Sequence, residues 1–144
     1  MRTLTIKRKK TFVACACKMQ VYIESFDGTG TEINGVYCRK LGELKNGEEK
    51  SFQIGDDSAK VFVIADSISK NYCNDCYQLP EGTEDITLCG QNKFNLATGN
   101  AFVFENNHTP EAVENRKRNV RKGVVILVVL FVVSFIIGFL IGIR

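Results

Sequence analysis

The final stretch of the chain, residues 123–143, consists of apolar residues, glycine and one serine, with no charged side chain. As an α-helix it would be about 31 Å long, which matches the ~30 Å hydrocarbon core of a bilayer. An apolar helix can also be buried inside a protein, but the rest of this chain offers no amphipathic helix to surround it. We therefore predict a transmembrane helix over residues 123–143.

Positive charge is concentrated directly before this span, whereas only Arg144 follows it. The positive-inside tendency therefore predicts that the N-terminal part lies in the cytoplasm and that the C-terminus crosses the bilayer. This layout is typical of a single-pass, tail-anchored membrane protein. The cations that we expect to contact lipid headgroups at the membrane surface are Arg116, Lys117, Arg118, Arg121 and Lys122.

Charge is divided along the rest of the chain in a way that the formal net charge of +3 does not reveal. Residues 1–10 contain five cations, whereas residues 11–115 contain 8 cations against all 16 acids, a net charge of −8. The basic N-terminal arm fits a solvated strand end, a second lipid contact or a weak nucleic-acid contact. Nucleic acid ranks last because the acidic domain would repel phosphates, so we expect no nucleic-acid partner.

Turn-forming residues recur at short intervals between residues 11 and 105, and strand-like runs lie between them. Met19, Val21 and Ile23 alternate with the residues between them, as in a half-buried strand. The continuous apolar run 61–65 indicates a strand covered on both faces. Further strands are expected at 12–17, 36–41, 51–54, 86–89 and 101–105. About seven to nine short strands predict one all-β domain, a small β-sandwich or barrel.

The chain thus divides into four parts, and its length leaves no room for a second domain. They are a basic N-terminal arm (1–10), a β-sandwich domain (11–105), a polar then basic juxtamembrane connector (106–122) and the transmembrane helix (123–143). No motif in these parts identifies a named family.

Six cysteines invite a chemical interpretation. In the cytoplasm thiols stay reduced, which argues against structural disulfides. Cys73 and Cys76 have the spacing with which one loop offers two thiolates to zinc, and Cys38 or Cys89 could complete the site. A redox role is disfavoured by Asp75, whose charge opposes a thiolate beside it. We favour packing as small buried hydrophobes and expect no cofactor, with zinc as the alternative.

Catalysis has little support in the sequence. His108 is the only histidine, and it lies in the polar connector without an evident nucleophile beside it. The acidic pairs adjoin turn signals, where they favour turns rather than metal binding. We therefore expect no catalytic residues and no enzymatic activity.

Small residues recur every four positions on one face of the predicted span: Ser134, Gly138 and Gly142. Such spacing lets two membrane helices approach closely and pack. The sequence therefore predicts a homodimer formed through the transmembrane helix as one possible assembly.

Three functions of different kinds follow from these observations. The favoured one is a membrane-tethered adaptor, in which a cytosolic β-sandwich binds a protein partner that the sequence does not identify. The alternative is a membrane-anchored zinc- or thiol-dependent protein that uses Cys73 and Cys76. An enzyme acting at the lipid interface is the third and least favoured, since no catalytic set supports it.

Overall fold

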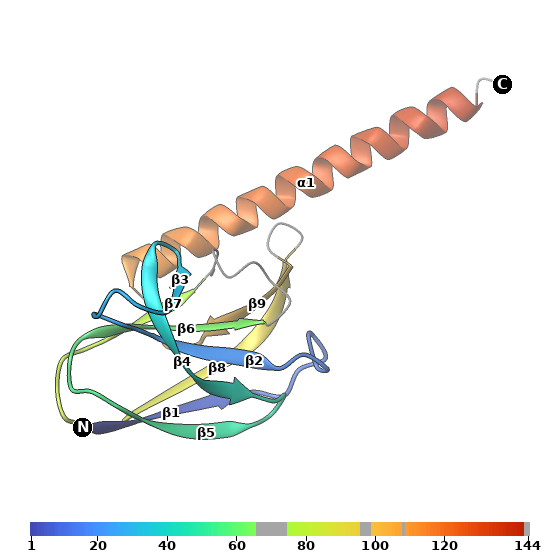
Figure 1. Ribbon diagram of the computed structural model, residues 1–144. Helices are drawn as coiled ribbons and strands as arrows, with labels where there is room; N and C mark the ends of the chain where they lie inside the picture. The colour runs from blue at the N-terminus through green and yellow to red at the C-terminus, as the bar shows by residue number, and fades with distance from the viewer. Residues whose placement is uncertain (66–74, 96–98, 108, 143–144) are drawn as a thin grey trace.

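The computed structural model describes residues 1–65, 75–95, 99–107 and 109–142. Within these residues the chain forms two β-sheets packed as a sandwich, followed by one long helix (Figure 1). The elements are β1 (Arg2–Arg8), β2 (Met19–Glu24), β3 (Thr31–Ile33), β4 (Val36–Leu44), β5 (Glu49–Ile54), β6 (Ala59–Ala65), β7 (Cys76–Leu79), β8 (Ile86–Asn95), β9 (Gly99–Phe104) and α1 (Pro110–Gly142). The predicted all-β sandwich with a C-terminal apolar helix is confirmed.

One sheet has the strand order β5-β1-β8-β9 and the other has the order β3-β4-β2-β6-β7. β1 pairs in parallel with β8, and the other strand pairs are antiparallel. Because β1 and β8 run the same way, the segments that follow them lie at the same end of the sandwich. This pairing decides which loops are neighbours.

The main core fills the space between the two sheets. Every second side chain along β1, β2 and β6 points into it, which is the alternation that a strand requires. Its fully buried members include Leu4, Ile6, Met19, Val21, Leu44, Val61 and Leu79.

A second, smaller core lies on the outer face of the β3-β4-β2-β6-β7 sheet. It consists of Tyr22, Ile33, Cys38, Phe62 and Ile64, with Val36 and Cys76 packed against it. The run 61–65 is therefore covered on both faces, as its continuous apolar character predicts.

The N-terminal segment differs from its predicted role. Residues 1–10 are not a free basic arm, because Arg2–Arg8 forms a central strand in which Leu4 and Ile6 are fully buried. Residues 12–17, predicted as a strand, form turns instead, so the N-terminal strand lies earlier in the sequence than expected. Leu4 and Ile6 alternate with threonines, which is a strand pattern, but the prediction of a basic arm weighed the flanking cations more heavily.

Other strands match their predicted positions but are longer. The predicted strands 36–41 and 86–89 continue to Leu44 and Asn95 respectively. Strand β7 begins at Cys76, inside a segment that was interpreted as a loop. These extensions come from tertiary pairing, which lets polar residues continue a strand.

The connector 106–122 is largely helical, because α1 begins at Pro110 and runs unbroken for 33 residues. Thr109 caps it: the N–H of Ala112 donates to the Thr109 hydroxyl at 3.3 Å, and proline is favoured at the first helical position. Ala112 and Asn119 are buried. The helix is long and apolar enough to cross a membrane, and none of its apolar window is buried.

The sandwich has two ends, which we name after the most exposed phenylalanine at each. The Phe12 end comprises loop 9–18 and the β8–β9 hairpin, and the Phe26 end comprises loop 25–30 and turn 55–58. Figure 1 shows α1 crossing the sandwich and leaving it on the side of the Phe12 end.

Candidate functional site

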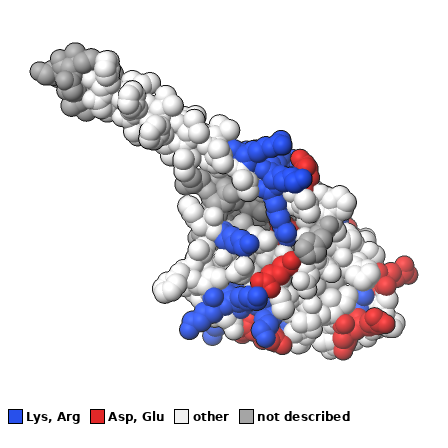
Figure 2. Space-filling model, turned by 180° about the vertical axis from the view of Figure 1, so that it is seen from behind, with Lys and Arg blue, Asp and Glu red and all other residues white. Residues whose placement is uncertain are grey.

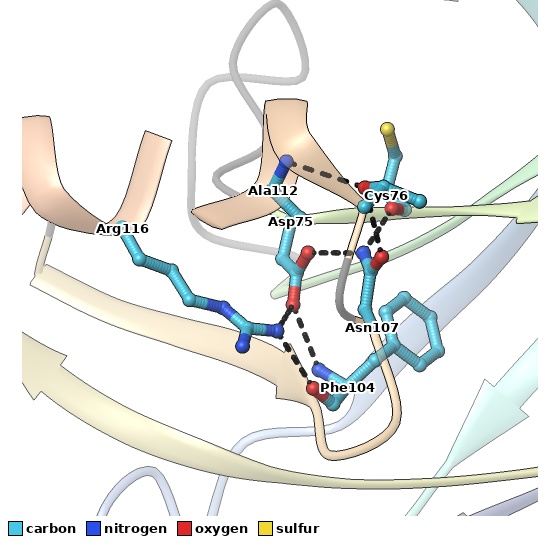
Figure 3. A network of polar contacts seen from close by, with 7 residues as sticks. Asp75, Cys76, Phe104, Asn107, Ala112 and Arg116 are labelled. Carbon is cyan, nitrogen blue, oxygen red and sulfur yellow. Dashed lines mark hydrogen bonds and ion pairs between the residues drawn. The ribbon is translucent and has the colours of Figure 1, made fainter. Parts of the chain in front are cut away.

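A buried carboxylate, Asp75, joins the sandwich to the base of α1 (Figure 3). Its Oδ2 accepts a hydrogen bond from the backbone N–H of Phe104 at 2.9 Å and one from Nη2 of Arg116, also at 2.9 Å. The same Arg116 nitrogen donates to the Phe104 carbonyl at 2.8 Å. One guanidinium group therefore holds the end of β9 and the start of β7 together.

Asn107 completes this network from the segment between β9 and α1. Its amide nitrogen donates to Asp75 Oδ1 at 2.6 Å and to the Cys76 carbonyl at 2.5 Å. The Thr109 hydroxyl, which caps the helix, donates to Asn107 Oδ1 at 3.1 Å. The cap of α1 is thus connected to a buried charge in the sandwich.

Burial raises the pKa of Asp75, and the charge and hydrogen bond of Arg116 oppose this shift. The Phe104 N–H and the Asn107 amide oppose it too. The carboxylate accepts hydrogen bonds on both of its oxygens. We interpret the network as a fastening between the domain and the helix, not as a reactive centre.

The Phe26 end has a shallow depression of about 260 Å³. Residues of β2, β4 and β6 meet there, together with loop 25–30 and the turn that follows β5. Phe26 stands at its rim with 68% of its surface exposed. The lining residues are Ile23, Glu24, Ser25, Phe26, Asp27, Arg39, Gly55, Asp57 and Ala59.

The loop that carries Phe26 is held in shape by Asp27. The Asp27 carboxylate accepts hydrogen bonds from the Ser25 hydroxyl at 2.5 Å and from the Thr29 N–H at 2.9 Å. These bonds lower the pKa of Asp27 to about 2, with the Ser25 bond the largest cause. Asp27 therefore stays ionised at any physiological pH and keeps a negative charge beside Phe26.

Arg2 fixes the floor of the Phe26 end from inside the sandwich. It is buried, and its guanidinium donates to the carbonyls of Gly55 at 3.2 Å, Asp57 at 3.0 Å and Pro80 at 2.6 Å. Turn 55–58 and the segment after β7 are thereby held to the first residue of β1. Side chains around the depression rest on an ordered frame, which a binding surface needs.

One of the five cations predicted at the membrane surface, Arg116, turns toward the domain. Arg116 takes part in the Asp75 network, while Lys117, Arg118, Arg121 and Lys122 are exposed on the helix (Figure 2). Sequence position alone does not separate these roles, because all five cations precede the span.

The cysteines proposed for zinc lie in separate places. Cys38 on β4 and Cys76 on β7 are three strand positions apart, roughly 14 Å at the usual strand spacing, and Cys89 belongs to the other sheet. Burial, then the charge of Glu24, raises the pKa of Cys38 to about 11. Cys73 lies outside the described residues, as does His108. No group of three metal-ligating side chains occurs in the part of the chain that the structure describes.

The predicted helix-packing face is open along the apolar part of α1. The Ser134 hydroxyl donates to the Leu130 carbonyl of its own helix at 2.8 Å, and no atom lies within 4 Å of a Cβ placed at Gly138. Gly142 is the last residue of α1. A second helix would find room on this face.

The sequence does not single out the residues that organise the site: Asp75, Asn107 and Arg2. For Arg2, a charged residue at the start of an alternating strand is a usable signal. Asp75 gives no such signal, because burial of a carboxylate follows from its partners in space.

Compared with known proteins, the chain matches no protein-family model and no curated protein.

Proposed function

We propose that this chain is a membrane-tethered protein-binding module. Its helix α1 crosses the bilayer, and its sandwich lies in the cytosol with the Phe26 end available to a partner. The observation that carries the proposal is the exposure of the helix: large apolar side chains between Val124 and Phe139 are 38–72% exposed. Such a surface is stable only in lipid or against other apolar helices.

Cytosolic placement is supported by the cations at the base of the span. Lys117, Arg118, Arg121 and Lys122 are exposed directly before the apolar segment, where a cytosolic leaflet would attract them.

The Phe26 end supports a binding role better than a catalytic one. It combines an exposed aromatic side chain, which is a common anchor in interfaces, with a concave floor and a fixed loop. Its acids Glu24, Asp27 and Asp57 outnumber Arg39, so the surface favours a partner segment that carries positive charge. The Ser25 hydroxyl is bonded there to Asp27, but the pKa of that carboxyl is lowered to about 2, so it is too weak a base to activate a nucleophile.

Two experiments test the proposal in cells that express the full chain. Protease added outside intact cells should leave the domain uncut and should cut it after the cells are opened. A photocrosslinking amino acid at position 26 should then capture a protein that the same amino acid at Thr87, an exposed site on the other sheet, does not capture. Equal capture from both positions, or digestion from outside, would contradict the proposal.

A further inference from the structure

Phe12 is 98% exposed, the highest value among the large apolar side chains that the structure describes outside the helix. It lies at the tip of loop 9–18, between β1 and β2. Phe94, 61% exposed, lies on the β8–β9 hairpin at the same end of the sandwich. Two exposed aromatic side chains therefore lie at one end of the sandwich.

The backbone holds Phe12 outward from both sides. Before it, Thr11 is fixed by Asn46, which accepts from the Thr11 N–H at 3.0 Å and donates to its carbonyl at 2.9 Å. After it, buried Arg8 donates to the carbonyls of Ala14 and Cys17, both at 2.7 Å. Exposure of Phe12 is therefore built into the fold and does not arise from a loose loop.

Backbone strain occurs in this loop as well. Ala14 has φ of 53°, in the left-handed region that residues with a Cβ rarely adopt. Such strain persists only where surrounding contacts impose it, and it concentrates at functional segments. Here the Arg8 hydrogen bond to the Ala14 carbonyl is one such contact.

The position of α1 places the Phe12 end beside the membrane. Arg8, the last residue of β1, pairs with Gly90, and β8 then continues to Asn95, so loop and hairpin extend in the same direction. Figure 1 shows the apolar part of α1 leaving the sandwich on this side. A bilayer around α1 therefore lies next to the Phe12 end, whereas the Phe26 end is turned away.

The charge of this end suits a lipid surface. Its exposed cations are Lys9, Lys10, Lys18 and Lys93. Lys9 and Lys18 pair with Glu105 and Glu43 respectively, and Lys10 and Lys93 add positive charge to the surface. Figure 2 shows basic side chains both on the helix base and on the adjoining part of the sandwich, with acidic side chains prominent on the opposite side of this face.

We propose that the Phe12 end is a second membrane contact, at which Phe12 and Phe94 enter the interface of an anionic bilayer and the lysines bind its headgroups. Aromatic side chains favour this region, and nearby lysines add electrostatic attraction to anionic lipid. The contact rests on the proposed membrane anchor and goes beyond it, because it fixes how the sandwich is oriented on the membrane.

The chain has no tryptophan, so the Phe12→Trp variant of the full chain has a single fluorescent reporter at the loop tip. The Phe26→Trp variant is the matched control, since Phe26 is also exposed but lies at the opposite end. Both variants are reconstituted into phosphatidylcholine vesicles containing a minority of phosphatidylglycerol, with or without bromine on the acyl chains. Circular dichroism verifies that each variant is folded.

Vesicles should blue-shift the emission of the Phe12→Trp variant, and bromine on the acyl chains should quench it. The emission of the Phe26→Trp variant should stay unquenched by bromine and accessible to aqueous iodide. Vesicles of phosphatidylcholine alone should weaken the quenching, because the lysines then lack anionic headgroups. Loss of emission in both variants, or in neither, would overturn the proposal. So would protection of the Phe12→Trp variant from iodide without quenching by bromine, which indicates a protein partner or a second copy.

Flotation of the same vesicles separates this proposal from the one that it rests on. If the chain floats with the lipid while the Phe12→Trp variant is not quenched, the anchor holds and the second contact is wrong. If the chain does not float, the membrane anchor itself is wrong. Crosslinking from position 26 is independent of both results.

Discussion

Oδ2 of Asp75 and Nη2 of Arg116 lie 2.9 Å apart, and this pair links a buried point of the sandwich to the base of the membrane helix. Asp75 is almost wholly buried, whereas Arg116 is about one-third exposed. A buried carboxylate that loses its cation is costly, and partial exposure of the cation reduces that cost.

The Arg116→Gln variant should therefore lower the free energy of unfolding by about 1–3 kcal/mol. Chemical unfolding of the detergent-solubilised full chain, followed by circular dichroism, measures the change. Lys117→Gln is the control, because Lys117 is exposed on the next position of the helix. Equal stability of the two variants would show that the pair does not fasten the helix to the sandwich.

The raised pKa of Asp75 predicts a pH dependence of defined sign. Burial is the main cause of the shift, so between the ordinary and the raised pKa the folded chain holds a proton that the unfolded chain has released. The contribution of this group to the free energy of unfolding is largest below about pH 4, falls as pH rises through the raised pKa, and is constant above it.

Unfolding of the wild type and of Asp75→Asn across a pH series tests this expectation. The wild-type free energy minus that of Asp75→Asn should decrease from acid toward neutral pH, since asparagine does not titrate. An increase over the same range would mean that Arg116 outweighs burial and that the pKa is lowered instead.

Arg8 is expected to be essential for loop 9–18. It is buried, and its guanidinium bonds Asn92 and the carbonyls of Ala14, Cys17 and Leu44. Lysine cannot replace the several N–H donors of the planar guanidinium group, so Arg8→Lys should still lower the free energy of unfolding by about 2–4 kcal/mol.

The control is Lys7→Gln, which breaks only a surface ion pair with Glu49 and should lower the free energy of unfolding by less than about 1 kcal/mol. Hydrogen exchange should show faster exchange of loop 9–18 in Arg8→Lys alone.

Gly90 should not tolerate a side chain. A Cβ there would overlap the ring of Phe102 and come within 2.8 Å of the Val103 carbonyl oxygen. Gly90→Ala should therefore destabilise the sandwich by about 1–3 kcal/mol. Gly55→Ala is the control, because its nearest neighbour lies at an ordinary 3.6 Å. Thermal unfolding that ranks these variants in the reverse order would contradict the packing of β8 against β9.

Self-association through the span predicts a face-dependent effect. Gly138→Ile should reduce energy transfer between donor- and acceptor-labelled chains in vesicles, because a large side chain keeps two helices apart. Val129→Phe adds bulk to the opposite face of α1, since nine residues at about 100° each place it half a turn from Gly138, and it should leave energy transfer unchanged. Equal loss in both variants would indicate contact without a preferred face.

The sequence predicted the sandwich and the span because each rests on a pattern within a short segment. The run 61–65 records its burial directly in residue type, whereas the alternation from Met19 to Ile23 predicted a half-buried strand and the intervening Gln20 and Tyr22 are buried as well. The role of residues 1–10 was mispredicted because charge at the ends of β1 obscured Leu4 and Ile6. Arg2 and Arg8 are buried because backbone carbonyls from distant parts of the chain surround their guanidinium groups. Such tertiary contacts cannot be read from the local sequence.

The candidate site was less predictable for the same reason. Asp75 follows Cys73 and Asn74 in a segment that suggested metal binding, and its partners come from positions 104, 107 and 116. Phe26 and Asp27 were apparent only as part of a turn, since the depression forms from three separate strands. Residues brought together from distant positions leave no local spacing to detect.

Helix α1 is continuous from Pro110 to Gly142, and its first turns are fastened to the sandwich. Rotation of the helix about its axis within the bilayer therefore turns the sandwich by the same angle. In a dimer that packs through Gly138, the contact between the two spans would set which sides of the two sandwiches face each other. The residues of the membrane helix would then determine the spacing and relative orientation of two Phe26 ends, and hence which bivalent partner could bridge them.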